Sequence, residues 1–194
     1  MYDLVRSRER ARFLVCGDNF LQTAASGAPA ATQFPPLRSG DFIYRPAAPY
    51  PDLTSGGKKM LILVDEIQSE STLWQMVQTF AGNFAHPVET VALTGVDIKG
   101  GCLGCCRCGL DNTCRYQGKD GYIDFYNEKV KGADIIVFAG EIRDRYLSSR
   151  WKQFFDRSFF NTHTPTLTGK QIAFLISGPL GQLLNLTEIL SAYA

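Results

Sequence analysis

Five of the six cysteines in this chain lie within thirteen residues, and four of them form a spaced motif. Their spacing is Cys102-x2-Cys105-x2-Cys108-x5-Cys114. Thiolates this close together can converge on one soft metal centre, and iron–sulfur clusters take four thiolates, often with two-residue gaps. Glycines alternate with these cysteines, at Gly100, Gly101, Gly104 and Gly109. Because glycine accepts positive φ, the backbone can wrap a compact object and point N–H groups at sulfur. The pattern predicts a metal site, with an iron–sulfur cluster as the first hypothesis.

Three other interpretations of the cysteines stay open. A structural zinc site normally pairs two C-x2-C units across a longer loop than the one found here. Disulfides need an oxidising compartment, and the N-terminal residues Met-Tyr-Asp-Leu-Val-Arg lack the basic and then apolar stretch of a signal peptide. Free thiols on a loop without metal are equally compatible with the spacing. Cys106 and Cys16 are interpreted as spare thiols.

Composition limits the class of protein and its partners. With 194 residues, 45% hydrophobic and 20% charged, the chain suits one soluble α/β domain with an appendage. The net charge of +1, from 20 basic and 19 acidic residues, recommends neither nucleic acid nor an anionic membrane as a partner. No apolar run approaches the roughly 20 residues that cross a bilayer. We therefore expect a cytoplasmic, reducing location, which keeps thiols available for metal.

The chain is predicted to divide near residue 57. Six of its nine prolines fall between Pro29 and Pro51, so residues 24–58 are expected to form a linker. Residues 1–57 are then an N-terminal extension with this linker, and residues 58–194 a single domain. Within the extension, Ala11–Cys16 could be a short strand and Asn19–Ala25 a turn of helix.

Strand and helix patterns alternate from Lys58 onward, which predicts a parallel sheet with helices on both faces. The expected strands are residues 60–64, 88–93, 135–138 and 171–176. The expected helices are residues 73–84, 122–130, 147–159 and 186–193. Aromatic residues of the third helix are expected in the core, namely Trp151, Phe154, Phe155 and Phe159.

In an open α/β sheet, ligands bind beyond the carboxyl ends of the strands. The first loop there, residues 65–72, offers the hydroxyls of Ser69, Ser71 and Thr72 beside a helix N-terminus, where a phosphate could bind. Capping of the helix by Ser69 or Ser71 explains these residues equally well. The loop has no glycine, which excludes a P-loop and a G-x-G-x-x-G dinucleotide site.

Two further loops are expected at the same edge. In residues 139–146, Tyr146 could stack on a flat ring and Arg143 or Arg145 could meet anionic groups, although surface ion pairing is the default explanation. Ser177–Gly181 has small residues that allow close backbone approach to a ligand, or a plain tight turn. No side chain is predicted to be an acid–base catalyst, since both histidines stand alone.

From about Lys58 to its end, the chain resembles the flavodoxin-like NAD(P)H-dependent FMN reductases, especially their iron–sulfur flavoprotein branch. The matching segments are Met60–Val64 with its Ser/Thr loop, the cysteine motif, Ala133–Ala139, Ser148–Arg157 and Gly169–Pro179. In two places the chain departs from the family. It has no Pro-x-Tyr after the third strand, and no Gly-Ser-Pro-Arg type sequence after the first.

The resemblance implies a doubly wound sheet of order 2-1-3-4-5, with FMN at the first and third strands and a [4Fe–4S] cluster near the flavin. The implied phosphate-binding residues are Ser69, Ser71 and Thr72. Those implied to line the isoalloxazine are Gly140, Glu141, Ile142, Arg143 and Tyr146, bordered by Ser177, Gly178 and Pro179. The implied cluster ligands are Cys102, Cys105, Cys108 and Cys114.

The implied function is a flavin-dependent oxidoreductase or electron-transfer protein, supplied by NAD(P)H or a ferredoxin-like donor. The alternatives are a pure electron carrier, an FMN reductase without a cluster, and a zinc-stabilised binding module without enzymatic activity. The family also implies a homo-oligomer.

The sequence shows no candidate for the family's fifth strand. The fourth strand would then present an apolar edge, which folded proteins normally cover. We expect either a truncated chain, an edge filled by Ala11–Cys16, or an edge filled by another subunit.

Overall fold

The structure is a computed structural model that describes residues 7–27, 37, 44–48, 53–161 and 164–194. The chain divides into two compact units, Met1–Pro36 and Leu37–Ala194. In the first unit, Ser7–Ala25 form one helix, α1. The predicted strand at Ala11–Cys16 is therefore wrong, because a run of six residues with strand propensity takes the conformation of the longer helix around it. Most of the predicted linker lies outside the described residues.

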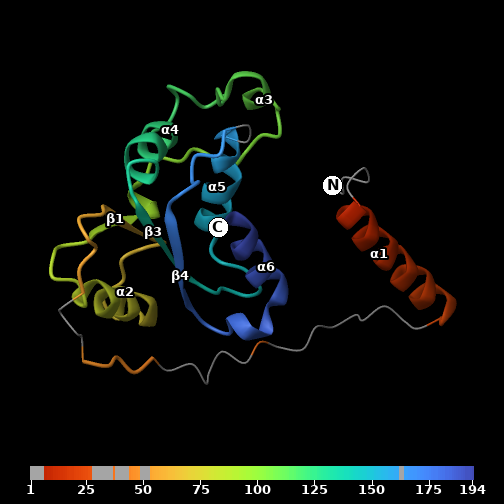
Figure 1. Cartoon of the computed structure of the whole chain (residues 1–194), viewed down its shortest axis with the longest axis horizontal. Helices are drawn as coiled ribbons and strands as arrows, with labels where there is room; N and C mark the ends of the chain where they lie inside the picture. Colours follow the sequence, from red (N-terminus) through yellow and green to blue (C-terminus); the bar gives the residue numbers. More distant parts are fainter. Residues whose placement is uncertain (1–6, 28–36, 38–43, 49–52, 162–163) are drawn as a thin grey trace. The chain divides into compact units, whose positions relative to one another are not determined.

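The second unit is built on a four-stranded parallel sheet of order β2-β1-β3-β4 (Figure 1). The strands are β1 (Met60–Val64), β2 (Glu89–Ala92), β3 (Ile135–Glu141) and β4 (Gln171–Ser177). All four were expected from the sequence, and β3 is the one that differs most, since it runs three residues further and ends in the loop at the carboxyl edge. After β1 the chain continues to β2 on one side of the sheet, and after β3 it continues to β4 on the other side. The topological switch point therefore lies between β1 and β3.

Helices cover both faces of the sheet, as predicted. The α-helices of this unit are α2 (Thr72–Gly82), α3 (Cys108–Asp111), α4 (Tyr122–Phe125), α5 (Ser149–Ser158) and α6 (Leu184–Tyr193). A π-helical turn, Tyr126–Val130, extends α4, and 3-10 turns occupy Leu93–Gly95, Phe159–Asn161 and Leu180–Gln182. None of the helices within the described ranges is long and apolar enough to cross a membrane.

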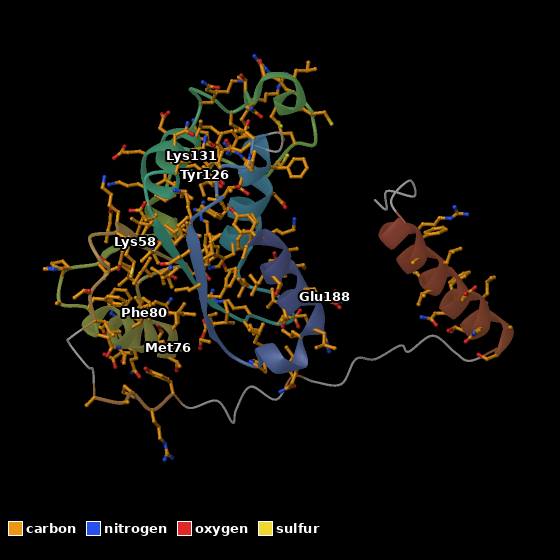
Figure 2. All side chains as sticks on the ribbon, in the orientation of Figure 1. Lys58, Met76, Phe80, Tyr126, Lys131 and Glu188 are labelled. Carbon is orange, nitrogen blue, oxygen red and sulfur yellow. The ribbon has the colours of Figure 1, made fainter. Side chains whose placement is uncertain are left out.

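The two sheet faces carry cores of unequal size. On one face, Ile62 and Val137 pack against Leu73 and Val77 of α2, and Phe80 lies beside this layer (Figure 2). The opposite face carries the larger core, where α4, α5 and α6 pack together over the side chains of β1 and β3. Alternate strand residues point to opposite faces, so strands covered on both sides are apolar throughout.

Aromatic rings dominate the larger core. Trp151 and Phe154 of α5 are fully buried and contact the ring of Phe138 on β3. The ring of Phe154 also contacts Tyr122, whose hydroxyl donates to the Phe154 carbonyl at 2.7 Å. The expectation that Phe159 is a core residue is wrong, because α5 ends at Ser158 and the Phe159 side chain is 61% exposed.

Candidate functional site

The cysteine segment lines one cavity of about 360 Å³ in the second unit. Its walls are formed by Cys102, Leu103, Gly104, Cys105, Cys106, Cys108, Gly109, Cys114, Arg115, Tyr116, Arg157, Phe159 and Phe160. The segment lies between β2 and α4 in the chain, and α3 begins at Cys108 (Figure 1). All four cysteines of the predicted ligand set therefore line the same space, with apolar side chains and two arginines, Arg115 and Arg157, around them.

The backbone of the segment is folded around sulfur. Gly104 has a φ of +61° and its N–H donates to Cys102 Sγ at 3.4 Å. Cys106 also has a positive φ, of 54°, and its thiol donates to the Gly104 carbonyl at 3.6 Å. At the far side, the Cys108 thiol donates to the Phe159 carbonyl at 3.9 Å. The glycine-rich spacing thus produces the N–H to sulfur contact expected of a metal-binding loop.

The Cys108 thiol is influenced by the other three, but the four do not form a coordination sphere. Burial raises the pKa of Cys108, and the neighbouring thiols of Cys102, Cys114 and Cys105 raise it further. Within the part of the chain that the structure describes, no group of three or more His, Cys, Asp or Glu side chains lies close enough to hold a metal ion as it stands. The structure therefore brings the predicted ligands to one cavity but not into ligand geometry.

The donor set and the size of the cavity bear on which metal group these thiols could hold. Thiolates are soft donors that bind iron–sulfur clusters or zinc. The cavity of about 360 Å³ is many times the roughly 30 Å³ that one water takes in the liquid. Apolar walls and a nearby cation also suit an anionic cluster, whose properties depend on burial and on hydrogen bonds to sulfur.

A buried ion pair fixes the ends of the cysteine segment. Arg157 Nη1 and Nη2 donate to the Asp120 carboxylate at 2.7 and 3.0 Å, and both side chains are inaccessible to solvent. Arg157 Nη1 also donates to the Gly100 carbonyl at 3.1 Å, and the Lys99 N–H donates to Asp120 at 3.1 Å. Burial raises the pKa of Asp120, but the bonds from Arg157 and Lys99 outweigh it and lower that pKa overall. Sequence reasoning missed Asp120, since a lone acidic residue carries no pattern.

A second buried carboxyl lies at the carboxyl edge of the sheet. Asp65 directly follows β1, and the Ser148 hydroxyl donates to its Oδ1. Asp65 Oδ2 is buried and has no hydrogen-bond partner within the described residues. Burial raises the pKa of Asp65, and the Ser148 bond only partly opposes this. Both residues were missed as site candidates, although their place beside the switch point could have indicated them.

The first loop is occupied by helix capping. Ser71 is the N-cap of α2; its hydroxyl accepts from the Trp74 N–H at 3.1 Å and donates to the Gln68 carbonyl at 2.9 Å. The capping alternative is thus confirmed for Ser71, while Ser69 is exposed and Thr72 opens the helix. The loop carries the carboxylates of Asp65, Glu66 and Glu70 and no lysine or arginine. These residues do not fit a phosphate dianion, which like charges repel.

The second and third loops are joined to each other. The Ile142 N–H donates to the Ser177 carbonyl at 2.9 Å. Gly178 has a φ of +115°, and a Cβ there would lie 3.0 Å from Ile142 Cβ. These contacts place the second loop, which was expected to line the flavin ring, beside the third loop, which was expected to border it. Both loops lie at the carboxyl edge of the sheet. Pro179 is buried there as well.

The rest of the second loop folds back on itself. The Arg143 N–H donates to the Tyr146 carbonyl at 2.9 Å, and Asp144 between them has a φ of 59°. Arg143 Nε lies 3.4 Å from Glu141 Oε2 at the surface, in agreement with the ion-pairing explanation. Tyr146 is half-buried against the larger core, and a Cβ at Gly140 would lie 3.0 Å from Trp151 Nε1. These contacts use much of the surface that was expected to face a ligand.

The cysteine cavity and the switch point lie at opposite ends of α5. Ser148, the N-cap of α5, contacts Asp65, whereas Arg157 in its last turn lines the cavity. Nine residues of helix rise about 14 Å, at 1.5 Å per residue. About 14 Å of helix therefore separates the N-cap that contacts Asp65 at the switch point from the arginine that lines the cysteine cavity.

Comparison with known proteins finds a likeness in structure but no match in family. No family model matches the sequence, and no curated protein matches it. One solved structure that it resembles is the crystal structure of RosB with bound intermediate OHC-RP (8-demethyl-8-formylriboflavin-5'-phosphate). The likeness has 19% sequence identity and a TM-score of 0.44, and it covers 69% of this chain. The chain spans 60% of the length of that protein.

Proposed function

We propose that this chain is an electron-transfer protein or oxidoreductase whose cysteine segment holds an iron–sulfur cluster. The observation that carries the proposal is the cavity of about 360 Å³, around which Cys102, Cys105, Cys108 and Cys114 are all arranged. A cluster bound there supplies one-electron transfer. The cysteine segment would have to close to bring the four thiols from one cavity into one coordination sphere.

The chain's own residues would support such a centre in distinct ways. The four thiolates would be its ligands. The Gly104 N–H already donates to Cys102 Sγ, as outer-shell donors to ligating sulfur do. Leu103, Phe159 and Phe160 would exclude water from one side of it. The Asp120–Arg157 pair would hold the ends of the segment at fixed positions.

The remainder of the proposal comes from the family resemblance. The order β2-β1-β3-β4 equals the first four positions of the flavodoxin-like order 2-1-3-4-5. A flavin such as FMN would occupy the switch point, and NAD(P)H or a ferredoxin-like partner would supply electrons in the cytoplasm. The acidic first loop does not fit the phosphate of such a flavin, so the electron-transfer role would rest on the cysteine segment.

The test is a visible spectrum of anaerobically purified protein with iron, sulfide, zinc and flavin assays. We expect brown protein with about four irons per chain, as for a [4Fe–4S] cluster. Serine at Cys102, Cys105, Cys108 or Cys114 should abolish the colour. Cys106→Ser is the matched control from the same cavity wall and should keep it.

Other outcomes would favour the other interpretations. Bound FMN without iron would indicate a flavin reductase with spare thiols. Colourless protein with about one zinc per chain would make the cysteine segment a structural site. Protein with neither metal nor flavin would overturn the proposal.

A further inference from the structure

We propose that Arg157 positions and tunes the iron–sulfur cluster by donating its Nε–H to a cluster or cysteine sulfur. This inference rests on the function proposed above. It assigns a role to an arginine that the sequence pattern alone does not connect with the cysteines.

The guanidinium is held in one orientation by its surroundings. Its two terminal nitrogens bind the Asp120 carboxylate in a bidentate manner, which fixes the plane of the group. The guanidinium carbon lies 4.0 Å from the centre of the Tyr116 ring and 4.8 Å from that of Tyr122. An arginine clamped between two rings and a carboxylate has little freedom to turn elsewhere.

One donor of this clamped group has no partner. Arg157 is 1% exposed, and its Nε is buried without any hydrogen bond within the described residues. An unsatisfied buried donor costs about 1–3 kcal/mol, and more on a charged group, so native proteins rarely keep one without a purpose. A purely structural ion pair would need only the terminal nitrogens that Asp120 and Gly100 already occupy.

The unpaired donor belongs to a residue that faces the cysteines. Arg157 is among the residues that line the cavity, whereas Asp120 is not. The pKa of Arg157 is lowered by burial but raised overall, chiefly by Asp120 and also by the nearby thiol of Cys114. Arg157 thus forms part of the cavity wall, whereas Asp120, which pairs with it, does not. A hydrogen bond to sulfur from this side stabilises the more negative, reduced form of a cluster.

The decisive variant is Arg157→Lys, which keeps the charge but removes the Nε–H and the planar fork. We expect it to bind iron and to have a lower midpoint potential. A tenfold change in the reduction equilibrium corresponds to about 59 mV for one electron. Lys152→Met removes a cation from the exposed side of the same helix and serves as the control, with an unchanged potential.

A second measurement needs no variant of Arg157 to fold. In protein labelled with ¹⁵N-arginine, pulsed EPR of the reduced cluster should show coupling to a single arginine nitrogen. The coupling should persist in Arg115→Lys, which alters the other arginine of the cavity wall.

The outcomes separate this inference from the proposed function. A wild-type protein that binds no iron–sulfur cluster overturns both. A wild-type protein with a cluster but without ¹⁵N coupling overturns the role of Arg157 alone. An Arg157→Lys protein that is less stable but has an unchanged potential also overturns it, because the arginine is then only a structural residue.

Discussion

Two buried aspartates, Asp65 and Asp120, have opposite electrostatic surroundings although both are nearly inaccessible to solvent. Asp120 accepts two bonds from the Arg157 guanidinium, and its pKa falls below the ordinary 3.8. Asp65 accepts a bond from the Ser148 hydroxyl, and burial raises its pKa above 3.8, which Ser148 and the charge of Arg143 oppose only in part. The two residues should therefore contribute to stability over different ranges of pH.

For Asp120 we expect stability that is lost in acid. A lowered folded pKa contributes stability that is present above 3.8 and disappears as the pH falls through the folded value. Asp120→Asn should cost about 3–5 kcal/mol at neutral pH, because it leaves the Arg157 charge buried and unpaired. The exposed pair Lys152–Asp156 on the same helix is the control, and Asp156→Asn should cost about 0.5 kcal/mol or less. Urea unfolding measures the free energy of unfolding of each variant. Equal losses of this free energy in Asp120→Asn and Asp156→Asn would contradict a special role for the buried pair.

For Asp65 the sign is reversed. A raised folded pKa contributes stability that is complete below 3.8 and is lost as the pH rises through the folded value. Asp65→Asn resembles the protonated carboxyl and keeps an acceptor for the Ser148 hydroxyl. We expect this variant to be more stable than the wild type at neutral pH and to lack the loss of stability on the alkaline side of 3.8. Unfolding curves recorded from acid to neutral pH measure the free energy of unfolding of both proteins. If this free energy changes with pH in the variant as it does in the wild type, the prediction is wrong.

Residue types and spacing predicted only part of the candidate site. Four thiols with short gaps carry a recognisable pattern, so the cysteine cavity could be anticipated. Asp120 could not, since it is a single polar residue whose importance arises from burial, and for Asp65 and Ser148 the only signal was their place beside the switch point. The serines of the first loop had two explanations, and only hydrogen-bond geometry could show that Ser71 is a cap.

At the scale of elements, substitution of Ser71 tests whether the first loop serves to cap α2. Its hydroxyl satisfies the Trp74 N–H, one of the orphan donors at the start of α2. Ser71→Ala should therefore cost about 1 kcal/mol of stability. Ser69→Ala, two residues earlier and exposed, should change it by less than about 0.5 kcal/mol. A Ser71→Ala variant that keeps its full stability would contradict the capping role. The contradiction would be sharper if the variant also lost the binding of a ligand to this loop.

Strands and helices of the second unit were predictable because each has a strong periodic pattern. Apolar runs such as β1 are buried on both faces, and the stripe on α2 begins directly after its cap. The failures were local. Ala11–Cys16 has strand propensity but belongs to α1, and Phe159 continues the apolar stripe of α5 one residue past its end. Helix boundaries are the least predictable feature of a sequence pattern.

At the scale of the whole molecule, the second unit begins earlier than its composition indicates. Leu53 forms a parallel bridge with Phe84, and its carbonyl accepts from the Ala85 N–H at 3.0 Å. The boundary between the two compact units lies between Pro36 and Leu37 rather than near residue 57. A composition rich in proline and small residues predicts a linker. Single residues of such a segment can still pack against the domain, as Leu53 does.

The edge of the sheet leads to the last prediction. Within residues 53–161 and 164–194, β4 pairs with β3 along one side and with no strand along the other. It is seven residues long, and Gln171 and Ala173 on it are exposed. Because folded proteins normally cover such edges, we expect a second copy of the chain to pair with β4.

Ala173→Lys tests this expectation by placing like charges near each other across paired edges. The wild-type chain should sediment as a dimer, and Ala173→Lys should shift it toward monomer by about tenfold or more in dissociation constant. Gln22→Lys adds the same charge to an exposed position of α1 in the other unit and should leave the dimer intact. Wild-type protein that remains monomeric at high concentration would show that the edge of β4 is left open or is covered by another molecule.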